Sequence, residues 1–228
     1  MGTEAELQQE NPFPSVGKPE RQFLNDQATR LLRDAIINGQ IRPGTKVAER
    51  NLAQWFGISR GPARDALLRL ETEGLVLNRG AGRYVLELNE HDIRELYDVR
   101  RALERLAVQG ATRRVSPESR ALLSAGLEEM REAVSKDDRV AYIESDVRTH
   151  QLIWKQAGNS YLARTLDVIA GPTFVFVSAS ARQFHDWEQT LAAHEELVAA
   201  INRGNTEEAV IAMDAHLDHA FQRTLRIF

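Results

Sequence analysis

The chain has 228 residues, of which 43% are hydrophobic and 27% charged, a composition typical of a soluble globular protein with one large or two modest domains. It contains no cysteine, which excludes a disulfide framework, a thiolate metal site and a catalytic thiol. The N-terminus is polar and acidic, and no apolar run has the length of a secretion signal or a membrane span. We therefore expect a cytoplasmic protein with no membrane partner.

Charge is distributed unevenly along the chain. The net charge of −4 argues against indiscriminate nucleic-acid binding. Residues 20–88, however, contain 11 Lys or Arg against 8 Asp or Glu, whereas residues 89–228 contain 17 against 22. A mildly basic front and an acidic back suit a protein that presents only one end to DNA.

The chain opens with a tail and a helix. Residues 1–20 are polar, rich in proline and without periodicity, which predicts a disordered tail. From Phe23 to Asn38 apolar residues recur at helical spacing, and Gly39 follows as a helix-ending residue. We expect this helix to brace the segment that comes next.

Residues 48–76 predict two short helices joined by a tight turn. Leu52, Ala53 and Phe56 indicate the first helix, and Ala63, Ala66, Leu67 and Leu70 indicate the second. The turn is Gly57-Ile58-Ser59, with Ser59 as the expected N-cap of the second helix. Arg60 and Arg64 share one face at the start of that helix. A helix with a basic first turn, in a compact helix-turn-helix, is suited to enter the DNA major groove with its N-terminus first.

Two short β-type runs follow this unit. Residues 75–77 and 84–86 flank the glycine-rich segment 78–83, which carries Arg79 and Gly80. This pattern predicts a winged helix-turn-helix whose wing touches the DNA backbone or the minor groove.

Residues 41–86 resemble the DNA-binding domain of the GntR family of bacterial transcription regulators. The matching residues are Ile41-Arg42-Pro43-Gly44-Thr45, Ala48-Glu49-Arg50, Leu52-Ala53, Gly57-Ile58-Ser59-Arg60, Pro62, Arg64, Leu67, Leu70 and Glu73-Gly74-Leu75. The DNA-binding residues that the resemblance implies are Arg50, Ser59, Arg60, Gly61, Pro62, Arg64, Arg79 and Gly80. Gly61 stands where the family commonly has threonine, which removes a possible hydroxyl contact, and Asp65 stands where glutamate is usual.

The rest of the chain predicts helices separated by short breaks. Their expected ranges are 89–114, 116–135, 138–156, 160–181, 184–202 and 206–228. On the first of them we expect Val99 and Leu106 to face inward with the rest of the apolar stripe. The apolar run 173–177 is assigned to a helix because no partner strand is available. The predicted fold is mainly α: an N-terminal winged helix-turn-helix over residues 21–88, then a C-terminal all-α six-helix bundle over residues 89–228.

Four polar residues fall on apolar helix faces in this second part. Asp146 and His150 are four residues apart, and His194 and His216 each lie among apolar residues on a later helix. Each residue alone is explained more simply, the histidines as satisfied core residues and the Asp–His pair as a helix hydrogen bond. Burying all four groups without compensation costs several kcal/mol, so convergence indicates a shared partner. Imidazole and carboxylate together suit a divalent transition metal, with Zn first and Ni, Mn or Fe as alternatives.

Residues 89–228 resemble the effector domain of the FadR branch of the GntR family, the FCD domain. Many members carry an Asp-x-x-x-His pair and two later single histidines, which Asp146, His150, His194 and His216 match in order and approximate spacing. The resemblance implies a homodimeric, effector-responsive regulator, usually a repressor, that binds a palindromic operator. A small carboxylate would complete the coordination of the metal. Arg100 could pair with that carboxylate, or simply with Glu104 one turn along the helix.

Two other functions of the second part remain open. A purely structural metal would tie three helices together without any effector. A metal-dependent hydrolase or lyase would use open coordination positions, with Glu195 offered as a base beside His194. Adjacent helical residues point in different directions, and no other nucleophile or acid–base pair stands out, so we expect no enzyme.

Overall fold

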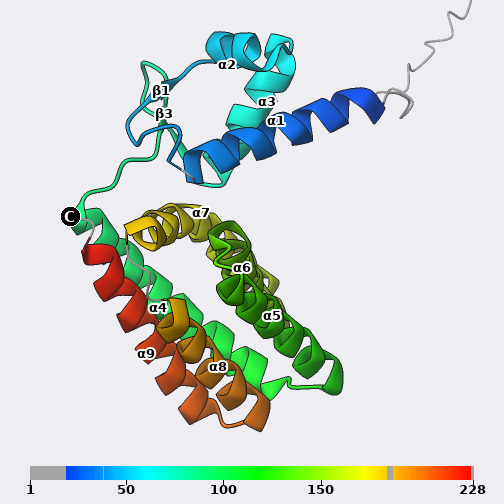
Figure 1. The fold of residues 1–228 in the computed structure, drawn as a ribbon, viewed down its shortest axis with the longest axis vertical. Coiled ribbons are helices and arrows are strands. Elements are labelled where there is room, and N and C mark those ends of the chain that lie inside the picture. Colours follow the sequence, from blue (N-terminus) through cyan, green and yellow to red (C-terminus); the bar gives the residue numbers. More distant parts are fainter. Residues whose placement is uncertain (1–18, 38, 184–186, 227–228) are drawn as a thin grey trace, which may run out of the picture.

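The computed structural model describes residues 19–37, 39–183 and 187–226. The tail was predicted over residues 1–20; residues 1–18 lie outside these ranges, and residues 19–20 belong to a helix. The predicted helix start at Phe184 also lies outside them. The chain forms a small head, at the top of Figure 1, above a bundle of helices. This arrangement confirms the predicted mainly-α fold class. None of the described helices has the length and apolarity needed to cross a membrane.

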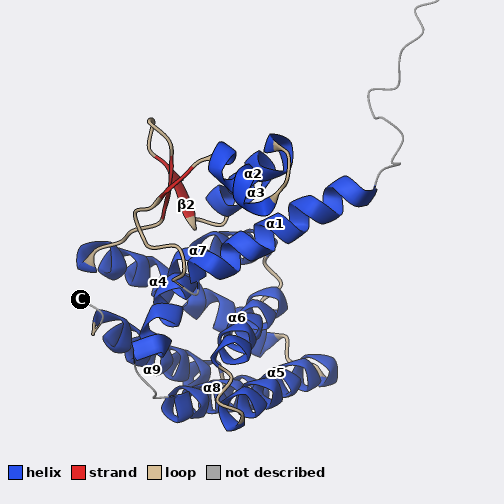
Figure 2. Cartoon of the chain, turned by 45° about the horizontal axis from the view of Figure 1, so that its top comes forward, coloured by secondary structure: helices blue, strands red, loops and turns tan. Residues whose placement is uncertain are grey.

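The head combines three helices and a small sheet. Its elements are α1 (Pro19–Ile37), β1 (Lys46–Val47), α2 (Glu49–Phe56), α3 (Arg60–Thr72), β2 (Val76–Asn78) and β3 (Arg83–Val85). The strands are antiparallel in the order β1-β3-β2, beside the helices in Figure 2. Helix α3 packs against both α1 and α2. Its apolar residues Ala63, Ala66, Leu67 and Leu70 are fully buried, which leaves its opposite face to solvent.

The bundle contains the remaining helices of the described chain. They are α4 (Glu90–Arg113), α5 (Pro117–Ser135), α6 (Arg139–Gln156), α7 (Ser160–Gln183), α8 (Trp187–Arg203) and α9 (Thr206–Leu225). Asn89 and Ser116 each cap a helix through a capping box, and Asp138 and Asn205 cap α6 and α9 with their side chains. These caps fix where the helices begin.

Helix α4 packs against four other helices of the bundle. Helix α4 packs against α6, α7, α8 and α9, while α5 packs against α6 and α8. Helix α7 lies beneath the head and also contacts α1 (Figure 1). The apolar core of the head continues into the bundle through Ile93 and Tyr97 of α4 and Ala220 of α9.

The structure corrects four details of the sequence-based expectations. Val99 and Leu106, predicted to face inward, are 51% and 56% exposed, because the inward face of α4 is formed by neighbouring positions. A third strand, β1, was not predicted, since two residues are too short for a periodic pattern. Helix α1 begins at Pro19 instead of Phe23. Ser59 occupies the N-cap position of α3, but its side chain makes no capping hydrogen bond.

Candidate nucleic-acid interface and metal centre

The turn between α2 and α3 presents the start of α3 to solvent. Gly57 ends α2 in the left-handed conformation, with φ of 62°, and its N–H donates to the Ala53 carbonyl. The chain then reverses, and α3 begins at Arg60. Since α3 has no acidic residue in its first turn, its positive dipole end remains available for an anion.

Most of the predicted DNA-contacting side chains lie on the surface of the head. Arg50, Ser59, Arg60, Gly61, Arg64, Arg79 and Gly80 are exposed, and Pro62 is half-buried. None of the four arginines forms an ion pair with any residue that the structure describes. Their charges are therefore not neutralised within the head, as binding to phosphate or to base edges requires.

The two arginines of the segment 78–83, Arg79 and Arg83, have different surroundings in the structure. Arg79 is exposed at the tip, where its N–H donates to the Gly82 carbonyl, and Gly80 has φ of 61°. Arg83, in contrast, lies 3.2 Å from Glu49 and 3.0 Å from Glu71. Arg83 thus ties the wing to α2 and α3, whereas Arg79 remains available at the tip.

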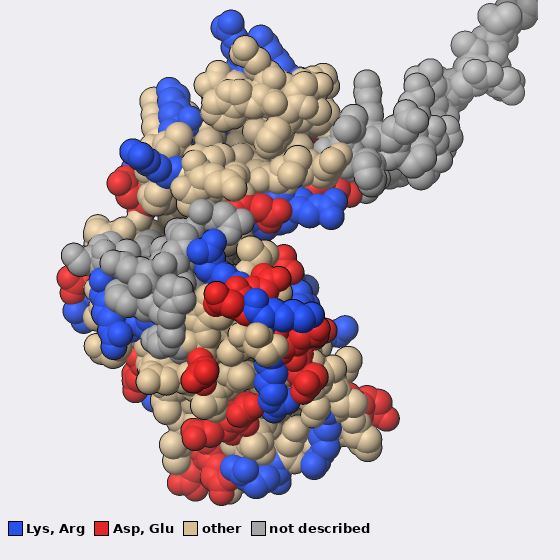
Figure 3. Space-filling model, viewed as in Figure 1, with Lys and Arg blue, Asp and Glu red and all other residues tan. Residues whose placement is uncertain are grey.

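Charged side chains on the face seen in Figure 3 differ between the head and the bundle. Lysines and arginines project from the outer edge of the head, at the top of the view. Acidic side chains are frequent over the bundle, where they alternate with basic ones. The end of the molecule with the exposed arginines is therefore the one suited to a polyanion.

Asp146, His150, His194 and His216 meet inside the bundle. They come from α6, α8 and α9, and each is at least 95% buried. Their ligand atoms all lie within 4.8 Å of one another. His194 Nε2 is 2.7 Å from Asp146 Oδ1, and His150 Nε2 is 3.1 Å from His216 Nε2. Ligands of one four-coordinate metal lie about 3–4 Å apart, so small shifts of these side chains would let all four bind one ion.

The outer nitrogens of two of these histidines have partners that only accept hydrogen bonds. His194 Nδ1 donates to the Thr190 carbonyl at 2.8 Å, and His150 Nδ1 lies 3.1 Å from the Glu104 carboxylate. With protons on Nδ1, both rings direct their Nε2 lone pairs inward. Metal-binding histidines are oriented in the same way by their second partners.

The pKa values of Asp146 and His216 are both shifted by their surroundings. Burial disfavours the Asp146 carboxylate, but the hydrogen bond and charge of His194, with His150 and Arg100, outweigh it and hold the pKa well below its ordinary value. Burial lowers the pKa of His216, and the nearby positive charges of the other histidines lower it further. An ionised aspartate is the form that binds a metal cation.

A positive charge is needed between His194 and Asp146. The inward lone pair of His194 Nε2 faces the Asp146 carboxylate at 2.7 Å, which is repulsive unless a positive charge lies between them. Either a proton on His194 or a metal ion supplies that charge. The contact between His150 Nε2 and His216 Nε2 is explained either by a hydrogen bond between the two rings or by a metal ion that both rings bind.

Three residues near the cluster were not assigned to it from the sequence: Glu104, Thr190 and Arg223. Glu104 is fully buried and accepts from Trp154 Nε1 at 2.8 Å, besides contacting His150. Thr190 holds His194 through its carbonyl and accepts from Arg223 Nη1 at 2.7 Å through its hydroxyl. Each lies one or two turns from a cluster residue or Arg100 in the sequence, which is the signal that could have identified it.

Arg100, the predicted effector-binding residue, is 97% buried beside this cluster. Its Nε lies 3.4 Å from Glu104, so the simpler pairing within the helix exists. Its Nη1, however, is buried without a hydrogen-bond partner among the described residues. A narrow cavity separates the guanidinium from α7 and is lined by Arg100, Trp154, Leu166, Ile169, Ala170 and Thr173.

The fold, with its exposed basic head, defines a DNA-binding transcription regulator with a separate helical domain. Residues 24–85 match the model of the bacterial regulatory proteins of the gntR family, and residues 95–219 match the FCD domain. The chain belongs to the GntR family and carries an FCD domain. Proteins of this family are transcription regulators, not enzymes.

Similar proteins agree with this membership over most of the chain. The gluconate operon transcriptional repressor of Bacillus licheniformis is 30% identical over 82% of this chain and 79% of its own length. The repressor RspR of Escherichia coli is 26% identical over 90% and 91%. Among solved structures, a putative GntR regulator from Rhodococcus has a TM-score of 0.72 at 24% identity, covering 90% of this chain and 98% of its own. E. coli McbR has a TM-score of 0.71 at 23% identity, covering 89% and 97%.

Proposed function

We propose that this protein is a homodimeric transcription repressor that binds a palindromic operator and responds to a small carboxylate held at a metal centre. Residues 21–88 read the DNA, and residues 89–228 form the dimer and the sensor. Zinc is the metal that the three-imidazole, one-carboxylate set fits first, with nickel, manganese or iron as alternatives. Repressors among the relatives support the direction of regulation.

The convergence of four buried ligand atoms carries the metal part of this proposal. Two of the histidine rings are locked by Glu104 and Thr190 with their inner nitrogens toward Asp146 and His216. Three histidines and one aspartate leave open positions on a metal that takes more than four ligands. A carboxylate oxygen is a suitable ligand for those positions.

Charge in the bundle supports an anionic effector. In the part of the chain that the structure describes, the buried charged side chains are Arg100, Glu104, Asp146 and Arg223. Their charges cancel. A divalent cation bound by Asp146, His150, His194 and His216 therefore leaves the space around this cluster and Arg100, here called the chamber, with a net positive charge. Arg100 supplies an unpaired Nη1 beside it. Gluconate, named in the description of the Bacillus licheniformis relative, is one carboxylate to test first.

An apolar stripe on α4 supports dimerisation. Val99, Ala102 and Leu106 follow one another at helical spacing and are exposed in the single chain. When a second copy of the chain places its own α4 against this stripe, the apolar stripes of both copies become buried, as a two-fold interface requires. The same pairing places two heads for the two halves of a palindrome.

A thermal-shift experiment tests the sensor. Protein stripped with a chelator is melted alone, with zinc, and with zinc plus each of a panel of small carboxylic acids. We expect zinc at about 100 times its Kd to stabilise the fold by about 2.7 kcal/mol, and one acid to add a further shift only when zinc is present. A zinc shift without any acid-dependent shift identifies a structural metal. A stripped protein that does not respond to any of the four metals refutes the metal centre.

A binding experiment tests the DNA-reading part. Duplexes are selected from random sequence by the purified protein and then measured by fluorescence anisotropy. We expect selected sequences with two-fold symmetry, and an affinity that changes when zinc and the active acid are added. Selection of asymmetric sequences contradicts the dimeric reading of DNA.

A further inference from the structure

Helix α7 lies between the buried chamber and the end of α3, the helix proposed to enter the DNA major groove (the recognition helix). On one side, Leu166, Ile169, Ala170 and Thr173 line the cavity beside Arg100. On the other side, Gly171 and Pro172 meet the residues that end α3. One turn of α7 is therefore the wall between the proposed effector site and the DNA-reading unit.

The contact between α7 and α3 depends on the absence of a side chain. A Cβ placed on Gly171 would lie 1.8 Å from the carbonyl oxygen of Glu73, closer than any side chain allows. Gly74, with φ of 71°, approaches the same turn, and a Cβ there would lie 3.0 Å from Pro172 Cδ. The two backbones thus meet directly at glycine positions, and a shift of α7 moves the end of α3.

Helix α7 is weakened at this turn. Pro172 lies inside the helix and has no N–H, so the carbonyl of Val168 lacks its usual partner four residues on. That carbonyl faces Gly74, with 3.4 Å from its oxygen to the position of a Gly74 Cβ. Helices bend most readily where a proline interrupts the hydrogen-bond ladder. The weak point of α7 therefore coincides with its contact to α3.

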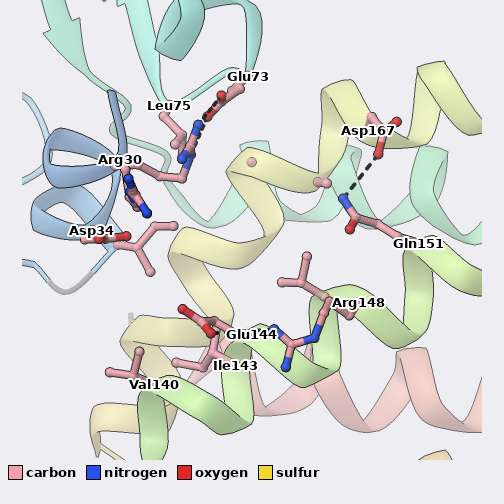
Figure 4. A pocket seen from close by; sticks show the side chains of 15 residues that line it. Arg30, Asp34, Glu73, Leu75, Val140, Ile143, Glu144, Arg148, Gln151 and Asp167 are labelled. Atoms are coloured by element: carbon pink, nitrogen blue, oxygen red, sulfur yellow. Dashed lines mark hydrogen bonds and ion pairs between the residues drawn. The ribbon is translucent and has the colours of Figure 1, made fainter. Parts of the chain in front are cut away.

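The neighbouring surfaces leave room for such a movement. A cleft of about 650 Å³ separates α1 and the end of α3 from α6 and α7. Figure 4 shows Arg30 and Asp34 on the head side of this cleft and Val140, Glu144 and Arg148 on the bundle side. Arg33 of α1 donates two hydrogen bonds to the Glu73 carboxylate, from Nε at 2.8 Å and from Nη2 at 2.5 Å. Glu73 therefore moves together with α1 and α3.

We propose that the Val168–Thr173 turn of α7 transmits occupancy of the chamber to α3 through the contact of Gly171 with Glu73. The cavity beside Arg100 is too narrow for a water molecule, so a ligand that enters it displaces α7. A metal ion that shifts α6, which carries both His150 and the cavity residue Trp154, displaces α7 as well. The displaced turn pushes on Glu73 and Gly74 and changes the placement of the recognition helix. This regulation rests on the proposed function, because it requires a ligand in the chamber.

Hydrogen–deuterium exchange of the full-length protein, with and without zinc, tests the transmission. In the wild type we expect zinc to change exchange in α6 and α8, and to change it about fivefold or more in residues 69–76. In Gly171→Ala the change in α6 and α8 persists, whereas that in residues 69–76 disappears. Pro172→Ala, which removes atoms instead of adding them, reduces it as well. Thr165→Ala, at an exposed position of the same helix, behaves as wild type.

A second experiment, which needs no metal, tests the transmission independently of the proposed metal site. Leu166→Phe enlarges a side chain that lines the cavity and pushes α7 outward without any metal. We expect it to alter exchange in residues 69–76, and Leu166→Phe/Gly171→Ala to lose that effect. If zinc changes nothing but Leu166→Phe alters residues 69–76, the metal site fails and the transmission stands. Unchanged exchange in residues 69–76 under both perturbations, or a full response in Gly171→Ala, overturns the transmission.

Discussion

Replacement of Glu104 by glutamine isolates the contribution of one buried carboxylate to the metal centre. Glu104 holds three groups at once: His150 Nδ1 at 3.1 Å, Trp154 Nε1 at 2.8 Å and Arg100 Nε at 3.4 Å. Glutamine has the same shape but lacks the charge, so it orients the His150 ring less firmly. Loss of such a second partner weakens metal binding about 10- to 100-fold, which is about 1.4–2.7 kcal/mol.

The same substitution also removes the charge that compensates Arg100. Breaking a buried ion pair costs about 3 kcal/mol or more, so the metal-free variant melts about 6–12 °C lower. Zinc affinity is measured on the folded variant at low temperature by competition with a chelator of known affinity. Trp154→Phe is the control, because it removes one hydrogen bond to Glu104 and leaves the carboxylate on His150. A folded Glu104→Gln protein with wild-type zinc affinity refutes the assignment of Glu104 as the residue that orients His150.

Three other substitutions test the remaining parts of the account. Arg64→Ala removes an exposed basic side chain at the start of α3, and it weakens operator binding about tenfold to a hundredfold without changing the melting temperature; unchanged anisotropy titrations contradict it. His194→Ala removes one ligand and lowers zinc retained after gel filtration, as elemental analysis measures; one full equivalent of zinc argues against the site. Leu106→Glu puts a charge in the exposed stripe of α4 and shifts the protein from dimer to monomer in analytical ultracentrifugation; a persistent dimer places the interface elsewhere.

The arrangement of helices was largely predictable because each helix carries local signals. Apolar residues at helical spacing and capping residues such as Asn89 and Ser116 lie within a few positions of the structures that they specify. Strand β1 was missed because its two residues form a strand only through pairing with β3. Val99 and Leu106 were placed inward because an apolar residue on a helix indicates burial but not the partner that buries it.

The candidate metal ligands were identifiable because each carries an imidazole or carboxylate on an apolar helix face. The structure brings all four together, but the residues that orient them depend on contacts between different helices. The contact of Glu104 with His150 joins α4 to α6, and the hydrogen bond from Arg223 to Thr190 joins α9 to α8. Such pairs have no sequence spacing of their own, so only the packed bundle reveals them. Transmission through Gly171 is of the same kind, since its contact is with a carbonyl about a hundred residues earlier.

Zinc K-edge X-ray absorption on the full-length protein tests the central claim most directly. Stripped protein is loaded with one equivalent of zinc, passed through a desalting column and measured with and without the acid identified by thermal shift. We predict a nitrogen and oxygen shell at about 2.0–2.2 Å with the outer-shell scattering of three imidazoles, and an altered shell when the acid is added. Zinc lost on the column, or retained without imidazole scattering, contradicts the claim that this buried cluster is a metal-centred sensor.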